Sequence, residues 1–166
     1  MSIGDYLAVG LASWFGIGFI PLFPNAWAVV AAYLLIVALG RHVGRLGLAL
    51  ALIGVTVTGT WASSAWGSLS EISDDGRIVI DEVAGYLLCI LVARRVDFLG
   101  ATGLAAAFVA LDALKPWPFD RVETLPFGLG VMGDDLAAGL ALGVAYVIAT
   151  QMWRRISGGP DAHDGK

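Results

Sequence analysis

The stretch DEVAGYLLCILVA, residues 81–93, places two acids directly before an unbroken apolar run. The stretch DDLAAGLALGVAYVIAT, residues 134–150, repeats this arrangement near the end of the chain. In lipid, backbone polar groups must find partners within their own segment, so both apolar runs are expected to be helices. Two acidic pairs at the edges of such helices indicate a shared polar site at one end of a helical bundle.

The composition of the whole chain is typical of a membrane protein. Hydrophobic residues make up 58% of the 166 residues and charged residues 14%, with a mean hydropathy of +0.79. The intervals 6–40, 46–70 and 136–153 contain no charged residue, and each could approach or cross a hydrocarbon core about 30 Å thick. A soluble globular fold is therefore not expected.

Charge and cysteine content exclude other classes of protein. The net charge of −4 disfavours nucleic acid as a partner, because a phosphate backbone is bound by a basic surface. Cys89 is the single cysteine, so the chain has no internal disulfide and no thiolate metal cluster. The run from Cys89 to Arg95 fits the Cys-x5-Arg pattern of thiol phosphatases, but it lacks the turn of free N–H groups which that chemistry needs.

We predict an all-α fold, a small polytopic helical membrane bundle in which some segments are short or re-entrant. About six apolar segments are expected, at 6–20, 26–39, 46–66, 83–93, 98–114 and 136–153. Pro21 and Pro24 should separate the first two. The segments at 83–93 and 98–111 are short for full spans, so they either enter part of the bilayer or lie inside the bundle. We expect one membrane-embedded domain over 1–157 and a disordered tail over 158–166.

The two acidic pairs predict a divalent-cation site. Alternating turns would bring both pairs to the same end of the bundle, where like charges repel unless a cation neutralises them. Carboxylate oxygens are the ligands that Mg²⁺ prefers, whereas helix capping would account for one pair alone. The expected ligands are Asp81, Glu82, Asp134 and Asp135, with Asp74 nearby. These four paired acids are also the expected catalytic residues, with Glu82 suited to orient or deprotonate water.

A third group of residues surrounds Asp112, which follows a long uncharged run and so needs a partner or a function. Lys115 lies one turn further on and could simply pair with it, so both interpretations stay open. Lys115, Arg121 and Arg77 would supply positive charge for a phosphate. The candidate substrate-binding residues are Arg77, Asp112, Lys115, Asp120 and Arg121.

These motifs together resemble the phosphatidylglycerophosphatase A family. The resemblance runs through 74–85 as Asp-x-Gly-x-Ile-Val-x-Asp-Glu-x-x-Gly, through 112–121, and through 130–139 as Gly-Val-Met-x-Asp-Asp-x-x-Ala-Gly. It implies a lipid phosphatase of the bacterial cytoplasmic (inner) membrane that uses Mg²⁺ to convert phosphatidylglycerophosphate to phosphatidylglycerol in phospholipid biosynthesis. Its partners would be the phospholipid substrate and membrane lipids.

The chain departs from the family pattern at several positions near the motifs. Asn25-Ala26 and Ala28-Val29 stand where the pattern has Gly-Thr and Gly-Ser, and Val109 stands where it has an arginine. These departures spare the acids but change the expected phosphate and headgroup contacts. Three alternatives therefore stay open: an enzyme similar to CDP-alcohol phosphatidyltransferases, a divalent-ion carrier, and a catalytically inactive paralogue.

The end of the bundle opposite the acids is expected to be rich in arginine. It would carry Arg41, Arg45, Arg94, Arg95, Arg154 and Arg155. Positive-inside counting would place the acids away from the cytoplasm. The family resemblance implies a cytoplasmic substrate instead, and we favour that side.

Overall fold

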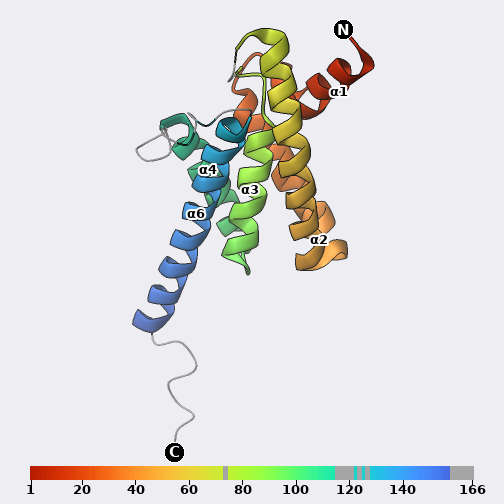
Figure 1. Ribbon diagram of the computed structural model, residues 1–166. Helices are drawn as coiled ribbons and strands as arrows, with labels where there is room; N and C mark the ends of the chain where they lie inside the picture. Colours follow the sequence, from red (N-terminus) through yellow and green to blue (C-terminus); the bar gives the residue numbers. More distant parts are fainter. Residues whose placement is uncertain (73–74, 115–121, 123–124, 126–127, 158–166) are drawn as a thin grey trace, which may run out of the picture.

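The computed structural model describes residues 1–72, 75–114, 122, 125 and 128–157, and for residues 39–43 it describes the backbone alone. In chain order the helices are α1 (Ile3–Ala12), the short 3₁₀ helix η1 (Ile17–Phe19), α2 (Pro24–Ser70), α3 (Ile80–Ala93), α4 (Phe98–Leu114) and α6 (Leu129–Ile156). Figure 1 shows them as a bundle with α3 between α2 and α6. The described residues contain no strand, so the all-α prediction is confirmed.

Helix α2 consists of two helical parts that meet at Gly44. Gly44 has φ 60° and ψ −174°, a conformation outside the helical region that glycine adopts without steric cost. Figure 1 shows the chain reversing its direction near this break, so that the second part of α2 runs back toward the start of α3. The predicted separation of the segments 26–39 and 46–66 is therefore observed.

Two predicted helix boundaries differ from the structure by more than a turn and a half. The expected run at 6–20 stops at Ala12, because Trp14 and Phe15 both adopt positive φ angles that no helix contains. The last helix begins at Leu129 rather than at 136, directly after Gly128 with φ 66°. Asp134 therefore lies inside α6 and not at its start. A pair of acids next to an apolar run does not by itself show where a helix begins.

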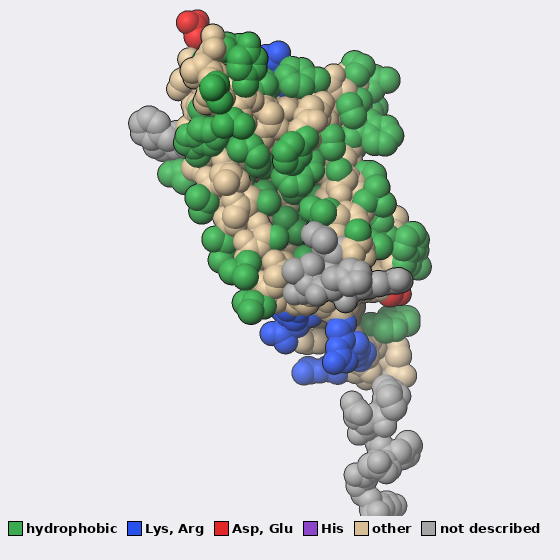
Figure 2. Space-filling view, turned by 90° about the vertical axis from the view of Figure 1, so that its right-hand side faces the viewer, with side chains coloured by type: hydrophobic (Ala, Val, Ile, Leu, Met, Phe, Trp, Pro, Cys, Tyr) green, Lys and Arg blue, Asp and Glu red, His purple; other side chains and the backbone are tan. Residues whose placement is uncertain are grey.

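The outer surface of the long helices is apolar. Exposed hydrophobic side chains recur every three or four residues along the second part of α2, at Leu50, Ile53, Val57 and Trp61, and along α6, at Leu140, Val144, Ile148 and Met152. Figure 2 shows one such face, covered largely by hydrophobic side chains. By length and composition, Gly44–Ser70 and Leu129–Ile156 are long enough to cross a membrane, and the other apolar helices described are shorter.

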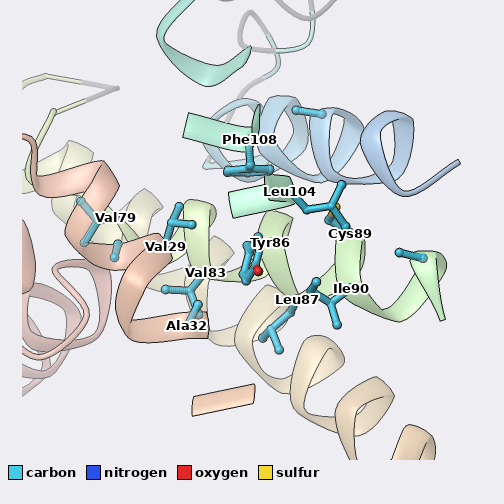
Figure 3. Packing of buried hydrophobic residues seen from close by; sticks show 13 residues of the cluster. Val29, Ala32, Val79, Val83, Tyr86, Leu87, Cys89, Ile90, Leu104 and Phe108 are labelled. Atoms are coloured by element: carbon cyan, nitrogen blue, oxygen red, sulfur yellow. The ribbon is translucent and has the colours of Figure 1, made fainter. Parts of the chain in front are cut away.

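Helix α3 is the core of the bundle. Eleven of its 14 residues are buried, although it is one of the shorter helices. Figure 3 shows its side chains meeting residues of α2 and α4, and Tyr86 packs edge-on against Phe108 with ring centroids 6.3 Å apart. The Tyr86 hydroxyl donates a hydrogen bond to the carbonyl of Ala101 at 2.8 Å. Of the two interpretations of the segment 83–93, the structure favours a helix inside the bundle.

The backbones of α3 and α6 approach closely at two glycines. A Cβ atom on Gly139 would lie 2.0 Å from the carbonyl oxygen of Gly85, and one on Gly143 would lie 2.8 Å from that of Cys89. The two α6 glycines are four residues apart and so lie on one helix face, the small-xxx-small spacing that permits close helix packing. This contact fixes the relative height of α3 and α6.

The predicted tail, 158–166, lies outside the described residues, and the expected single domain over 1–157 stays a prediction.

Candidate metal centre

Three buried carboxylates from two helices converge at one end of the bundle. Asp81 and Glu82 lie in the first turn of α3, and Asp135 lies in α6. One oxygen atom from each residue lies within 4.8 Å of the others. Their exposed fractions are 7%, 2% and 3%, so all three carboxylates lie away from bulk solvent.

The glycine contact between α3 and α6 explains why these acids meet. Gly85 follows Asp81 by four residues, and Gly139 follows Asp135 by four. Residues four apart share a helix face, so each acid stands one turn above the glycine through which its helix touches the other. A Cβ atom on Gly85 would also lie 2.6 Å from the carbonyl oxygen of Asp135, so the contact extends up to the acids.

The donor set fits a hard divalent cation. Carboxylate oxygens are the preferred ligands of Mg²⁺, and the described residues of this cluster include no softer ligand. The buried Oε2 atom of Glu82 has no hydrogen-bond partner among the described residues. A buried acceptor without a partner is costly, and a cation would satisfy it while neutralising the charge of the cluster.

The structure places the other predicted ligands differently. Asp134 is buried, and its Oδ1 atom accepts a hydrogen bond from the backbone N–H of Asp135 at 3.0 Å. Asp134 is not one of the three clustered carboxylates. Asp74 lies outside the described residues.

Asp112 has a partner that the sequence analysis missed. The side-chain amide of Asn25 donates a hydrogen bond to Asp112 Oδ2 at 3.1 Å, across 87 residues of sequence. Asn25 stands at one of the departures from the family pattern. That departure was the one feature of the sequence that could have drawn attention to Asn25. Lys115, Asp120 and Arg121, the other substrate-binding candidates of this region, lie outside the described residues.

Arg77 is held by Asp75, which the sequence analysis did not single out. Arg77 donates to both carboxylate oxygens of Asp75, with Nε 2.8 Å from Oδ1, and Trp66 Nε1 donates to Oδ2 at 3.1 Å. The hydrogen bonds from Arg77 hold the pKa of Asp75 at about 2, so the carboxylate stays charged at neutral pH. The arginine side chain is 49% exposed and its guanidinium lies over the Trp66 ring.

These contacts order the loop that leads into α3. The backbone N–H of Arg77 also donates to Asp75 Oδ1 at 3.1 Å, which makes a local turn typical of aspartate. Two residues later, the N–H of Val79 donates to the carbonyl of Ala12 at the end of α1, at 2.9 Å. The loop therefore places the first turn of α3, and with it Asp81 and Glu82. The aspartate-glycine pattern of this loop could have identified Asp75.

Cys89 lies away from this centre. It is fully buried in the hydrophobic core, and Arg94 and Arg95 lie beyond the end of its helix on the surface. A thiolate is disfavoured in such apolar surroundings, in line with the expectation that Cys89 has no chemical role.

Comparison with known proteins gives the same family as the motifs. Residues 10–150 match the family model of phosphatidylglycerophosphatase A. A relative from Bacteroides thetaiotaomicron, described as a putative phosphatidylinositol-3-phosphatase, is 28% identical over 155 residues, which cover 87% of this chain and 94% of the relative. No solved structure matches the chain. The matched range includes all three clustered carboxylates, and the chain belongs to the phosphatidylglycerophosphatase A family.

Proposed function

We propose that this protein is an integral membrane enzyme that uses Mg²⁺ to hydrolyse the terminal phosphomonoester of phosphatidylglycerophosphate, which yields phosphatidylglycerol. The observation that carries the proposal is the convergence of Asp81, Glu82 and Asp135 within 4.8 Å in a buried position. Family membership supports a phospholipid as the substrate class.

The three clustered carboxylates would hold the cation, and Asp74, which lies outside the described residues, is a further candidate. When bound, Mg²⁺ would supply positive charge to the phosphate oxygens and orient the reacting groups. Phosphomonoesters hydrolyse extremely slowly without a catalyst, and enzymes accelerate this hydrolysis by up to about 10²¹-fold. Neutralising the charge of the phosphate is therefore the main task of the site.

Glu82 is the residue best suited to accept the proton of the attacking water. Its carboxylate belongs to the buried cluster that would hold the cation, and its two oxygen atoms allow one to contact the cation while the other accepts the proton. The water oxygen would bond to phosphorus as the phosphorus–oxygen bond to glycerol breaks. The products are inorganic phosphate and the lipid alcohol, whose oxygen takes up a proton.

Basic residues from the stretch after α4 and from the loop before α3 would hold the phosphate group. Lys115 and Arg121 are the first candidates, together with Asp112 and Asp120 from the same stretch. Arg77 is a further candidate, since its guanidinium is half exposed and fixed in place by Asp75. An arginine fixed in this way loses little conformational entropy when it binds phosphate oxygens.

The apolar surface supports a membrane location. Two helical segments are long enough to cross a bilayer, and their outward faces are apolar. We propose that the six apolar segments form one bundle in the cytoplasmic membrane of a bacterium, in which the short helix α3 is enclosed by the others. Phosphatidylglycerophosphate would reach the carboxylates from one leaflet.

A second candidate substrate is phosphatidylinositol 3-phosphate. It is favoured by the description of the Bacteroides relative, which aligns over most of both chains. Asn25 and Val109 depart from the pattern of the family near the proposed phosphate site, and such changes alter headgroup contacts more readily than cation binding.

The test is phosphate release by the purified full-length protein in a non-ionic detergent. Phosphatidylglycerophosphate, phosphatidylinositol 3-phosphate and phosphatidic acid would each be supplied with Mg²⁺ or with EDTA. We expect Mg²⁺-dependent release, fastest from phosphatidylglycerophosphate, and loss of release in Asp135→Asn. No release from any of the three lipids would contradict the proposal and favour an inactive paralogue, a carrier or a phosphatidyltransferase.

A further inference from the structure

A basic pocket lies at the end of the bundle opposite the carboxylates. It has a volume of about 680 Å³ and is lined by Arg45, Arg94, Arg95 and Arg154, together with Ala93, Val147, Thr150 and Gln151. The arginines come from the Gly44 break in α2, from the residues after α3 and from the last turn of α6. Figure 2 shows Lys and Arg side chains gathered at one end of the molecule, beneath the hydrophobic surface.

Within the described part of the chain, no ion pair joins an arginine of this pocket to an acid, although Asp97 lines a neighbouring pocket together with Arg94. The ion pair that the described residues do form joins Arg77 to Asp75, at the other end of the bundle. Arg45 donates from Nη2 to the carbonyl of Leu91 at 3.1 Å, which ties one wall of the pocket to α3. Four guanidinium groups around one pocket favour an anion that offers several acceptor oxygens, such as a phosphate group.

The backbone of Arg94, at the edge of this pocket, has an unusual conformation. Arg94 ends α3 with φ 67° and ψ −94°, a conformation that non-glycine residues rarely adopt. Such conformations cost free energy and cluster at ligand sites. Arg94 lines the basic pocket and also the two neighbouring pockets, so its position connects them.

One of these neighbouring pockets is apolar and continues the basic one along α6. It has a volume of about 380 Å³ and shares Arg94, Val147 and Gln151 with the basic pocket. Its remaining lining residues are Val92, Val144 and Ile148, and the last two lie about two turns and about one turn before Gln151 on α6. The groove therefore leads away from the arginines into the apolar surface of the bundle.

We infer that these adjoining pockets form a binding site for an anionic phospholipid. The headgroup phosphate would lie among Arg94, Arg95 and Arg154, and an acyl chain would follow the groove past Ile148 and Val144. A basic pocket alone would suit any phosphate, but the apolar groove that shares its lining fits an amphiphile. Basic pockets between membrane helices bind anionic headgroups in this way.

This site is distinct from the proposed catalytic centre. Asp81 and Arg94 lie near opposite ends of α3, which rises about 1.5 Å per residue and so separates them by roughly 20 Å. One headgroup phosphate cannot contact both. A surplus of arginines near a membrane surface can reflect membrane orientation alone, but that rule does not require a pocket or an adjoining groove.

The experiment measures lipid binding to the full-length protein by titration calorimetry in a non-ionic detergent, with EDTA present. The probes are dioctanoyl phosphatidylglycerol, dioctanoyl phosphatidylcholine and glycerol 3-phosphate. The double variant Arg95→Gln/Arg154→Gln tests the headgroup pocket, and Arg155→Gln is its control, because Arg155 is next in the sequence and does not line the pocket. Ile148→Gln tests the groove, with Met152→Gln as control.

We expect dioctanoyl phosphatidylglycerol to bind the double variant at least about tenfold more weakly than it binds the parent protein or Arg155→Gln. Ile148→Gln should also weaken this binding, and both phosphatidylcholine and glycerol 3-phosphate should bind poorly to the parent. Unchanged affinity in the double variant would overturn the site. Equally tight binding of glycerol 3-phosphate, or no effect of Ile148→Gln, would overturn the assignment to a lipid. No hydrolysis is measured, so a failure of the proposed phosphatase activity would not affect this result.

Discussion

Asp81 and Glu82 occupy the first turn of α3, whereas Asp134 and Asp135 lie inside α6, which has already begun at Leu129. Both acids of α3 contribute an oxygen to the buried carboxylate cluster, but only Asp135 of the α6 pair does. Asp134 instead accepts a hydrogen bond from the backbone of its neighbour. Two adjacent acids thus have different surroundings, and adjacency in sequence does not imply a shared role.

The two pairs are brought together by a backbone contact rather than by side chains. Gly85 and Gly139 let α3 and α6 touch one turn below the acids. The distance between the pairs is therefore set by the glycines. Variants of the acids test the carboxylate cluster, and variants of the glycines test the contact that brings its two helices together.

The largest effect is expected from loss of a clustered carboxylate. Asp135→Asn should lower kcat by at least about 100-fold, because residues that merely support a metal ligand already contribute 10- to 100-fold. Asp81→Asn should behave alike. Asp134→Asn is the matched control and should cost about tenfold or less. The check is Mg²⁺-dependent phosphate release, with thermal unfolding to confirm that each variant is folded. Equal losses at Asp134 and Asp135 would contradict the distinction between them.

A smaller loss is expected when the glycine contact is disturbed. The Cβ atom in Gly139→Ala would meet the carbonyl oxygen of Gly85, so the helices must separate, which should destabilise the protein by about 1–3 kcal/mol. The melting temperature and kcat should fall together as the acids move apart. Gly54→Ala is the control, since nothing lies near its Cβ position, and alanine there should keep or raise the melting temperature. Parental stability and activity in Gly139→Ala would show that the contact does not set the spacing.

A third prediction concerns phosphate binding by a residue outside both acidic pairs. Arg121→Lys should lower kcat/KM by about tenfold, because lysine cannot hold two phosphate oxygens as the planar guanidinium does. Kinetics over a range of lipid phosphate concentrations would check this. If Arg121→Lys and Lys115→Ala both retain parental kcat/KM, then Arg77 becomes the first candidate for the phosphate contact.

A milder effect is expected at Asn25. Asn25→Ala removes the hydrogen bond to Asp112 and should destabilise the protein by about 1 kcal/mol, with a severalfold loss of activity. Asn25→Asp is a useful second variant, because it would place a second carboxylate beside Asp112 and should be worse than alanine. Melting temperatures of the two variants provide the check, and the reverse order would contradict this role for Asn25.

The smallest effect is expected at Cys89. Cys89→Ala should retain kcat, because the thiol is buried in the apolar core and away from the carboxylates. A trapped phosphocysteine, or loss of hydrolysis at unchanged stability, would revive the thiol mechanism.

Helix periodicity and charge placement were enough to predict several features. They gave the all-α class, the break between the two parts of α2 and the buried position of α3 as one of two interpretations. Such features depend on local composition, which a single sequence displays. The paired acids also stood out, because charges are rare in a chain this apolar.

Other features depend on contacts between distant parts of the chain. The start of α6 was misplaced because the positive φ of Gly128 is visible only in three dimensions. Nothing in the sequence pairs Asn25 with Asp112, and although the aspartate-glycine pattern marks Asp75 as a turn residue, only the structure shows that Trp66 and Arg77 bind it. The gathering of arginines at the end opposite the acids was predicted from the alternating turns, but the pocket that they line was not.

Cation binding by the folded protein without substrate tests whether Asp81, Glu82 and Asp135 form a metal site. Mn²⁺ can stand in for Mg²⁺, because it also takes oxygen ligands, and its binding can be followed by electron paramagnetic resonance in detergent. We expect the parent protein and Asp134→Asn to bind Mn²⁺ with similar affinity, and Asp135→Asn to bind it at least about tenfold more weakly. Added Mg²⁺ should displace the bound Mn²⁺. Binding by Asp135→Asn that equals the parent, with Asp134→Asn impaired, would contradict the assignment of the site.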